Sequence, residues 1–471
     1  MNNFAASGYY RLTNNKRFKR AFQDCSVEQN MEEDSTAKYS KAKIVFRSLK
    51  YRNYRLFFSG QSISLIGTWM QRIALPWVVY QMTGSEVLLG IVGFAGQIPA
   101  FLLAPVAGVL TDRWSRYKVL LLTQIISMIQ AVILAWLSLA GVLEIWHIIV
   151  LSLAIGCINA FDMPARHSFV VEMVENKDDL GNAIALNSMM FNGAKLIGPS
   201  VAGLILATAG EGVCFLVNAL SYLFIIYSLL AMRLPVSEEK NTETQILSEI
   251  KEGFKYTFGF PPIKHIILLL ALVSLMSASY QVLMPVYAQE ILHGGSHTFG
   301  FLMGATGSGA LLGAIYLASR ESVLKLGRII PIATGLISAG MIALTFNTSF
   351  LISLFITAFA GLGMMIHTAS SNTIIQTITD DDKRGRVMSF YTMALMGTAP
   401  FGSLLAGWMA KMIGTPWTLC IGGAVCFIGT ISFYKKLPEL REIIKPVYVR
   451  KGIIPEVAKG IQTASEPAAG S

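Results

Sequence analysis

Two basic residues lie inside long apolar stretches of the chain. Arg72 falls a little beyond the centre of one stretch, and Lys195 lies near the centre of another. Steps of three and four residues place on one polar helix face Gln61, Ser64, Thr68 and Arg72. A charge in hydrocarbon costs at least ~2.5 kcal/mol unless it is paired or hydrated. We therefore expect both cations to face the interior of a helix bundle and not lipid.

Two uses of these cations stay open. They attract an anionic substrate, or they pair internally with Asp162 or with helix carbonyls, which the long stem of Lys195 would reach. Amides within apolar stretches pose the same choice, because they act either as substrate contacts or as hydrogen bonds between helices. The predicted substrate cavity comprises Arg72, Gln71, Thr68, Gln97, Asn187, Lys195, Asn218 and Gln281.

The sequence lacks the constellations that common enzyme classes need. HExxH, GxSxG and P-loop patterns do not occur, and the five cysteines form no CxxC pair. We therefore expect no catalytic residues, no cofactor and no metal site. The net charge of +10 raises the question of nucleic-acid binding, which the position of the charges answers.

Composition places most of the chain in a membrane. Of the 471 residues 53% are hydrophobic and 14% are charged, against about 25% charged in soluble domains. Apolar stretches long enough to cross ~30 Å of hydrocarbon occur at 55–81, 86–110, 118–140, 145–163, 182–207, 213–232, 264–290, 299–319, 329–347, 349–371, 387–411 and 416–434. The predicted fold class is an all-α membrane protein with 12 transmembrane helices.

The basic residues set the expected orientation. Placing the N-terminus in the cytoplasm puts every Lys and Arg except Arg72, Lys195 and Lys411 in a cytoplasmic segment or tail. This is the positive-inside asymmetry of membrane proteins. It accounts for the basic charge without nucleic acid, and with twelve spans it places both termini in the cytoplasm.

An internal repeat predicts two equivalent halves. Residues 181–203 and 385–407 align without a gap, and each segment follows an acidic run. Equal halves oriented alike imply an axis along the membrane normal and a substrate site between them near the midplane. The predicted organisation is a disordered N-terminal arm 1–53, helix bundles 54–232 and 264–436, a cytoplasmic linker 233–263 with an amphipathic helix near 245–258, and a tail 437–471.

Several motifs carry a family resemblance. The segment from Gly108 to Lys118 reads GVLTDRWSRYK and resembles the loop motif GxxxDRxGR[RK] of the major facilitator superfamily, with Ser115 in place of the second glycine. Gly198-Pro199 is similar to the antiporter motif of that superfamily. Residues 68–77, 159–166 and 384–388 are similar to the branch that contains the enterobactin exporter and macrolide efflux proteins. The resemblance covers about residues 50–437.

The resemblance implies a gate at the cytoplasmic face. It places the start of the eleventh helix, near Arg386, against the carboxylate of Asp112. Arg116 then bridges Asp112 to Asp162 and holds this side closed until the halves rock. In the alternative interpretation these charges only set the topology. The predicted gate comprises Asp112, Arg113, Arg116, Asp162, Arg166, Arg384 and Arg386.

Packing and energy coupling complete the expected working parts. The predicted helix-packing motif comprises Gly198, Pro199, Gly203, Gly402 and Gly407. The coupling candidates are Asp162 and His367, although a membrane histidine also serves as a hydrogen-bonding partner between helices.

The expected function is export of a small amphiphilic or anionic organic compound, siderophore or drug-like, by alternating access with proton antiport. Alternatives are a lysophospholipid flippase of the same fold and a non-transporting membrane sensor. The expected location is the cell (inner) membrane. The expected partners are the substrate, protons and the lipid bilayer, with no nucleic acid, and the chain is expected to act as a monomer.

Overall fold

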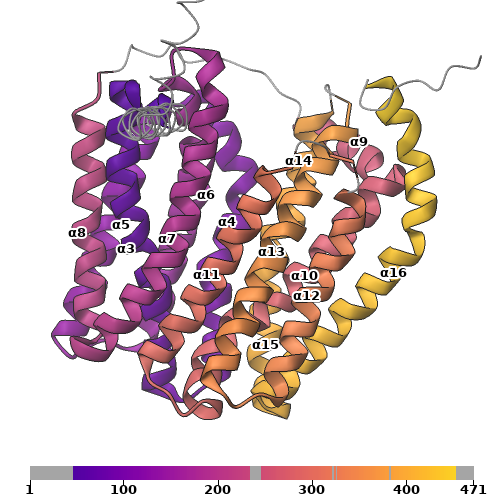
Figure 1. The fold of residues 1–471 in the computed structure, drawn as a ribbon. Helices are drawn as coiled ribbons and strands as arrows, with labels where there is room; N and C mark the ends of the chain where they lie inside the picture. The colour runs from indigo at the N-terminus through magenta and orange to yellow at the C-terminus, as the bar shows by residue number, and fades with distance from the viewer. Residues whose placement is uncertain (1–45, 234–245, 321–322, 325, 381–382, 452–471) are drawn as a thin grey trace, which may run out of the picture.

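The computed structural model describes residues 46–233, 246–320, 323–324, 326–380 and 383–451, apart from the side chains of residues 104–106, 108–109, 112–113, 177 and 246–250. The described chain is helical throughout (Figure 1). Its elements are η1 (Arg47–Lys50), α3 (Arg52–Thr83), α4 (Glu86–Arg113), α5 (Arg116–Leu139), α6 (Ile145–Glu172), η2 (Lys177–Asp179), α7 (Leu180–Thr208), α8 (Gly210–Leu230), α9 (Ile246–Gly259), α10 (Pro261–Val286), η3 (Tyr287–Ile291), α11 (Ser296–Ala318), α12 (Leu326–Phe346), α13 (Phe350–Ile378), α14 (Arg384–Met396), α15 (Ala399–Ile413) and α16 (Thr415–Arg450).

Each predicted apolar stretch falls on helical residues, although 387–411 is divided between α14 and α15, and the amphipathic helix of the linker is α9. Within the described residues, eleven helical segments are long and apolar enough to cross a membrane, with α14 and α15 forming one of them. The stretch that falls short is α3, because its polar face lowers the hydropathy of a helix 32 residues long. That α3 makes a twelfth crossing stays a prediction.

Short turns at one face, here called the distal face, require glycine. Gly84, Gly141, Gly210 and Gly414 follow the helices that end there, and all have φ between 57° and 84°. Residues other than glycine rarely adopt this left-handed backbone conformation. The opposite face, here called the terminal face, carries η1, α9 and the end of α16 at the top of Figure 1.

The helices form a first group, α3–α8, and a second group, α9–α16. The two groups meet where α7 packs on α11 and where α4 packs on α15. A Cβ added at Gly300 would lie 2.7 Å from the Cα of Gly203, and one added at Gly407 would lie 3.1 Å from the Cα of Gly90. Gly203 and Gly407 are aligned by the repeat, so the same close crossing occurs twice.

Gly198 and Gly402 are also aligned by the repeat, but their close contacts stay within one group. A Cβ at Gly198 would lie 2.5 Å from the Cβ of Trp69 in α3, and one at Gly402 would lie 2.1 Å from the carbonyl oxygen of Leu275 in α10. The predicted packing motif therefore divides by depth. Gly203 and Gly407 join the groups, whereas Gly198 and Gly402 pack helices within them.

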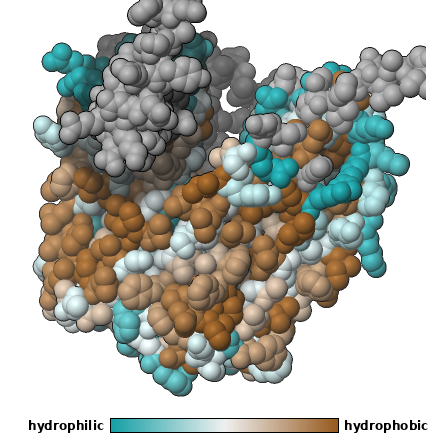
Figure 2. All heavy atoms as spheres, in the orientation of Figure 1, coloured by the Kyte–Doolittle hydropathy of each residue, from teal (hydrophilic) through white to brown (hydrophobic). Residues whose placement is uncertain are grey.

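Two expected boundaries are wrong. The last helix does not end near residue 434 but continues to Arg450, because Leu437 and Leu440 stay buried against the second group. The end of the predicted disordered arm is ordered, since Arg47–Lys50 forms η1; residues 1–45 lie outside the described residues. On the face drawn in Figure 2, apolar residues form a band across the middle of the molecule, and hydrophilic residues gather towards its two ends.

Candidate functional site

Arg72 and Lys195 approach the same aromatic ring. The guanidinium carbon of Arg72 lies 5.0 Å from the ring centroid of Trp69, and the Lys195 ammonium lies 5.8 Å from it. The ring of Phe191 meets Trp69 edge to face at 5.7 Å. These four residues, here called the Trp69 site, lie midway along α3 and α7. Sequence reasoning missed both aromatic residues, although Trp69 precedes Arg72 by three residues and so shares its side of the helix.

Packing between α3 and α7 fixes this arrangement. Leu65 of α3 is buried with Met190 and Ala194 of α7, and Trp69 packs against this cluster. The absence of a side chain at Gly198 lets the backbone of α7 approach Trp69 closely. Trp69 packs closely against Gly198, and this packing fixes the position of the indole ring. Both cations contact the ring in that position.

No carboxylate neutralises the Trp69 site in the described part of the chain. Neither Arg72 nor Lys195 forms a salt bridge there. Arg72 is solvent-exposed although it lies in the interior, near Tyr222 of α8 and Arg166 of α6. Cation–π contact with Trp69 stabilises the cations in part, but it leaves their net charge uncompensated.

Asp162 is already occupied within the first group. It forms an ion pair with Arg166 on its own helix and accepts hydrogen bonds from Thr123 (3.0 Å) and Gln124 (2.7 Å) of α5. The alternative in which Arg72 or Lys195 pairs with Asp162 is therefore wrong. The α5 contacts turn this carboxylate towards the neighbouring helix.

His367 has the corresponding place in the second group. It is fully buried in α13, and its Nδ1 lies 3.1 Å from the Thr334 hydroxyl of α12. Its Nε2 is buried without a hydrogen-bond partner. This hydrogen bond joins α13 to α12, as expected of a histidine that serves as a partner between helices. The coupling role of His367 stays a prediction.

Two of the predicted cavity residues are wrong, because they hold helices together. Gln71 and Asn218 are nearly inaccessible. The Asn218 amide donates to Gln71 at 2.7 Å, and the Gln71 amide donates to Gln130 at 3.1 Å. This chain links α8, α3 and α5 within the first group, which is the alternative use expected of intramembrane amides.

The other predicted cavity residues differ in their availability. Thr68 donates to the carbonyl of Ser64 and is partly buried. Gln97 is exposed on α4 and donates to the carbonyl of Gly93, whereas Gln281 is exposed on α10 and Asn187 is partly buried on α7. Thr68, Gln97, Asn187 and Gln281 stay candidates.

Among the described side chains, the bridge from Arg116 to Asp162 in the predicted gate is not formed. Arg116 pairs with Glu172 at 2.7 Å and not with Asp162. Arg386 pairs at 2.6 Å with Glu252 of the linker helix α9, and Arg384 is exposed at the start of α14. The side chains of Asp112 and Arg113 lie outside the described residues. Since the described ion pairs at the terminal face each stay within one helix group, the gate stays a prediction for the other conformation.

The distal face is closed by contacts that sequence reasoning did not identify. The Tyr80 hydroxyl of α3 donates to Glu290 of η3, and the Gln81 amide donates to Gln289 at 2.6 Å. The rings of Trp77 and Phe299 stack at 6.1 Å. The π-helical η3 begins two residues after Pro285 and presents Gln289 and Glu290 to α3. These contacts join the first helix group to the second.

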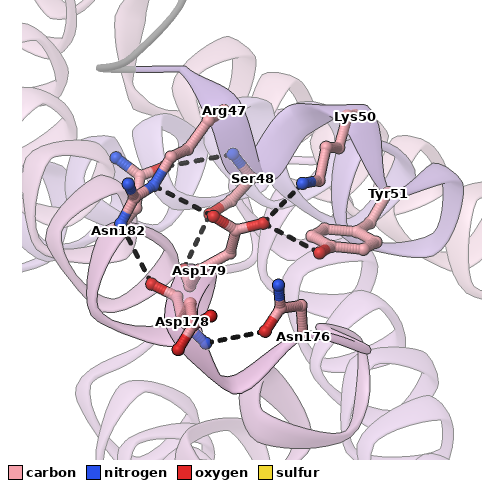
Figure 3. A network of polar contacts seen from close by, with 8 residues as sticks. All are labelled: Arg47, Ser48, Lys50, Tyr51, Asn176, Asp178, Asp179 and Asn182. Carbon is pink, nitrogen blue, oxygen red and sulfur yellow. Dashed lines mark hydrogen bonds and ion pairs between the residues drawn. The ribbon is translucent and has the colours of Figure 1, made fainter.

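An ionic cluster fixes η1 at the terminal face (Figure 3). The carboxylate of Asp179 is paired with Lys50 at 2.6 Å and Arg47 at 3.0 Å, and it accepts from the Tyr51 hydroxyl at 2.8 Å. The hydrogen bonds from Lys50 and Tyr51 lower the pKa of Asp179. The hydrogen bond with Asp179 raises the pKa of Lys50, and the hydrogen bond with Tyr51 raises it further.

The second group repeats this cluster. The Tyr256 hydroxyl donates to Asp380 at 3.1 Å, as Tyr51 does to Asp179. Arg450, near the end of α16, pairs with Asp380 at 2.8 Å. The acidic runs that precede α7 and α14 thus bind the segment before the first long helix of each group, namely η1 before α3 and α9 before α10.

The fold and the site define a class of protein. Apolar helices, two helix groups that meet towards the distal face, and an uncompensated cationic site at mid-depth are features of a multi-span membrane transporter of the major facilitator type. Over residues 45–461 the chain matches the family described as transmembrane secretion effector, and it belongs to that family.

Relatives and solved structures agree with this assignment. The Staphyloferrin A transporter of Staphylococcus aureus is 26% identical, over 81% of this chain and 95% of its own. The multidrug efflux pump Tap of Mycolicibacterium fortuitum is 24% identical, over 79% and 92%. A POT family transporter in complex with a thioalcohol-conjugated peptide shares the fold, with a TM-score of 0.66 at 13% identity over 83% and 96%. The resemblance to the major facilitator superfamily is confirmed, and the chain is a transporter and not an enzyme.

Proposed function

We propose that this transporter exports a small amphiphilic or anionic organic compound, siderophore-like or drug-like, by alternating access. The observation that carries the proposal is the Trp69 site, where Arg72 and Lys195 lie at mid-depth without a carboxylate partner among the described residues. A charge at this depth is costly, and such charges in membrane proteins mark substrate pathways. The names of the relatives support both kinds of cargo.

Alternating access would use the two helix groups as its moving parts, with bundles 54–232 and 264–436 joined by the linker 233–263. The described contacts between the groups gather towards the distal face and at mid-depth. In the proposed cycle these contacts break as the terminal face closes through Asp112, Arg116 and Asp162. In the proposed cycle, this structure is the half-cycle in which the terminal face is open.

The orientation, the energy source and the monomeric state belong to the same proposal. The positive-inside asymmetry puts the terminal face in the cytoplasm, so the open side faces the source of an exported cargo. Proton antiport would use Asp162 or His367, the buried titratable groups on equivalent helices α6 and α13.

Transport by the purified protein tests the proposal. We expect proteoliposomes with an imposed pH gradient to move a siderophore or a macrolide, and Arg72→Ala to reduce the rate about tenfold or more. Lys411→Ala removes the same charge from the exposed end of α15 and is expected to leave the rate unchanged. Movement of a lysophospholipid alone would favour the flippase alternative, and unchanged transport by Arg72→Ala would overturn the proposed site.

A further inference from the structure

Charge around the Trp69 site does not balance. Three cations lie in the interior of the first group, where Arg72 is within electrostatic range of both Arg166 and Lys195. One described carboxylate, Asp162, lies among them, and it is paired with Arg166. Two positive charges therefore remain, on Arg72 and Lys195, each on a different helix.

The two remaining charges share one aromatic surface. Arg72 reaches the Trp69 ring from its own helix α3, and Lys195 reaches the same ring from α7. Phe191, one turn before Lys195, is 40% exposed and meets the ring of Trp69 at its edge. An apolar surface with a cation from each of two helices is thus open to a ligand.

We infer that the cargo carries two acidic groups on an apolar or aromatic body, one group for Arg72 and one for Lys195. This inference rests on the proposed function and narrows it. A singly charged anion would leave one cation uncompensated at mid-depth, whereas a dianion compensates both. A cationic compound meets two like charges, so we expect it to bind most weakly.

The aromatic residues restrict the cargo further. Trp69 and Phe191 offer mainly apolar ring surface, which a small inorganic dianion cannot use because it has no apolar body. An organic dianion would also bury apolar area against both rings. The site therefore selects by charge number and by apolar body together.

Three dyes with one xanthene skeleton test the inference. In mildly alkaline buffer fluorescein is a dianion, its methyl ester a monoanion and rhodamine 123 a cation. Fluorescence polarisation with the purified full-length protein in detergent gives the dissociation constant of each. We expect the dianion to bind about tenfold more tightly than the monoanion, and the cation to bind most weakly.

Charge-removing and charge-keeping variants separate the roles. Arg72→Gln and Lys195→Gln are each expected to lower fluorescein affinity about tenfold, to the level of the monoanion, whereas Arg72→Lys and Lys195→Arg keep the preference for the dianion. Lys411→Gln is the matched control, and size-exclusion profiles check folding of every variant.

The outcomes distinguish this inference from the proposed function. Equal affinity for dianion and monoanion, together with loss of both in Arg72→Gln, would overturn the two-charge site and leave the anion transporter standing. Affinities that depend neither on dye charge nor on Arg72 and Lys195 would overturn both. Tight binding of sulfate that displaces fluorescein would overturn the role of the apolar body.

Discussion

Neighbouring residues on α3 have opposite uses. Gln71 is buried in a chain of amides that links three helices, whereas Arg72 is exposed beside Trp69. A rotation of about 100° per residue separates the two side chains on a helix. Polarity within an apolar stretch therefore does not distinguish a structural contact from a substrate contact.

Replacing Asn218 with alanine tests the structural role. The substitution removes the donor to Gln71 and is expected to cost about 1 kcal/mol of stability, seen as a lower melting temperature in detergent. Asn187→Ala is the matched control, since the described structure records no side-chain hydrogen bond for Asn187, and it is expected to melt as the wild type does. An unchanged melting temperature in Asn218→Ala would contradict the assignment.

The Asp179 cluster makes a pH-dependent contribution to stability. Because the pKa of Asp179 is lowered, its stabilisation is present above the ordinary value of 3.8 and is lost as the pH falls through the lowered value. Because the pKa of Lys50 is raised, its stabilisation is present below 10.5 and is lost as the pH rises through the raised value.

Melting temperatures measured across this range check the cluster. Asp179→Asn is expected to melt below the wild type by a constant amount between about pH 5 and pH 9, with the difference shrinking at both extremes. Asp178→Asn is the matched control, because Asp178 contacts Arg47 through its backbone carbonyl. A difference that stayed constant into strong acid would argue against an ionic role.

At the scale of the element, each helix fits its neighbours through a few close approaches. The pairs Gly203–Gly300 and Gly90–Gly407 let α7 meet α11 and α4 meet α15. The hydropathy of α3 falls short of a typical membrane helix because its polar residues face other helices and the Trp69 site. The split between α14 and α15, with Pro400 in the first turn of α15, is the element-level feature that the apolar pattern did not predict.

A methyl group at Gly300 is expected to open the distal face. Its Cβ would lie 2.6 Å from the carbonyl oxygen of Pro199, which requires the helices to separate at a cost of about 1–3 kcal/mol. Spin labels at Met82 and His293 should then report a longer mean distance in Gly300→Ala than in the wild type. Gly193→Ala, where a Cβ meets open space, should leave the distance unchanged.

At the scale of the whole molecule, contacts at the distal face hold the two helix groups together. Tyr80, Gln81 and Trp77 of the first group contact Glu290, Gln289 and Phe299 of the second. If the proposed cycle is right, transport requires these contacts to break.

A reversible cross-link tests this requirement. In a background without native cysteines, Gln81→Cys combined with Gln289→Cys is expected to be joined by a short, reducible bifunctional methanethiosulfonate, because the two native side chains meet across the helix groups. Transport should fall to the background rate and return after reduction. The single cysteine variants should transport under both conditions, and full activity of the cross-linked protein would contradict alternating access through this face.

The sequence by itself determined the helices, the parallel repeat and the superfamily, because hydropathy, charge bias and aligned glycines are properties of local sequence. It also identified Arg72 and Lys195, since a charge in an apolar stretch is visible without coordinates. Only the tertiary structure decided that Asp162 accepts from Thr123 and Gln124 of α5, that Gln71 and Asn218 bond to other helices, and that both cations meet at Trp69. These outcomes depend on which helix faces contact one another, and residues far apart in the chain set that contact jointly.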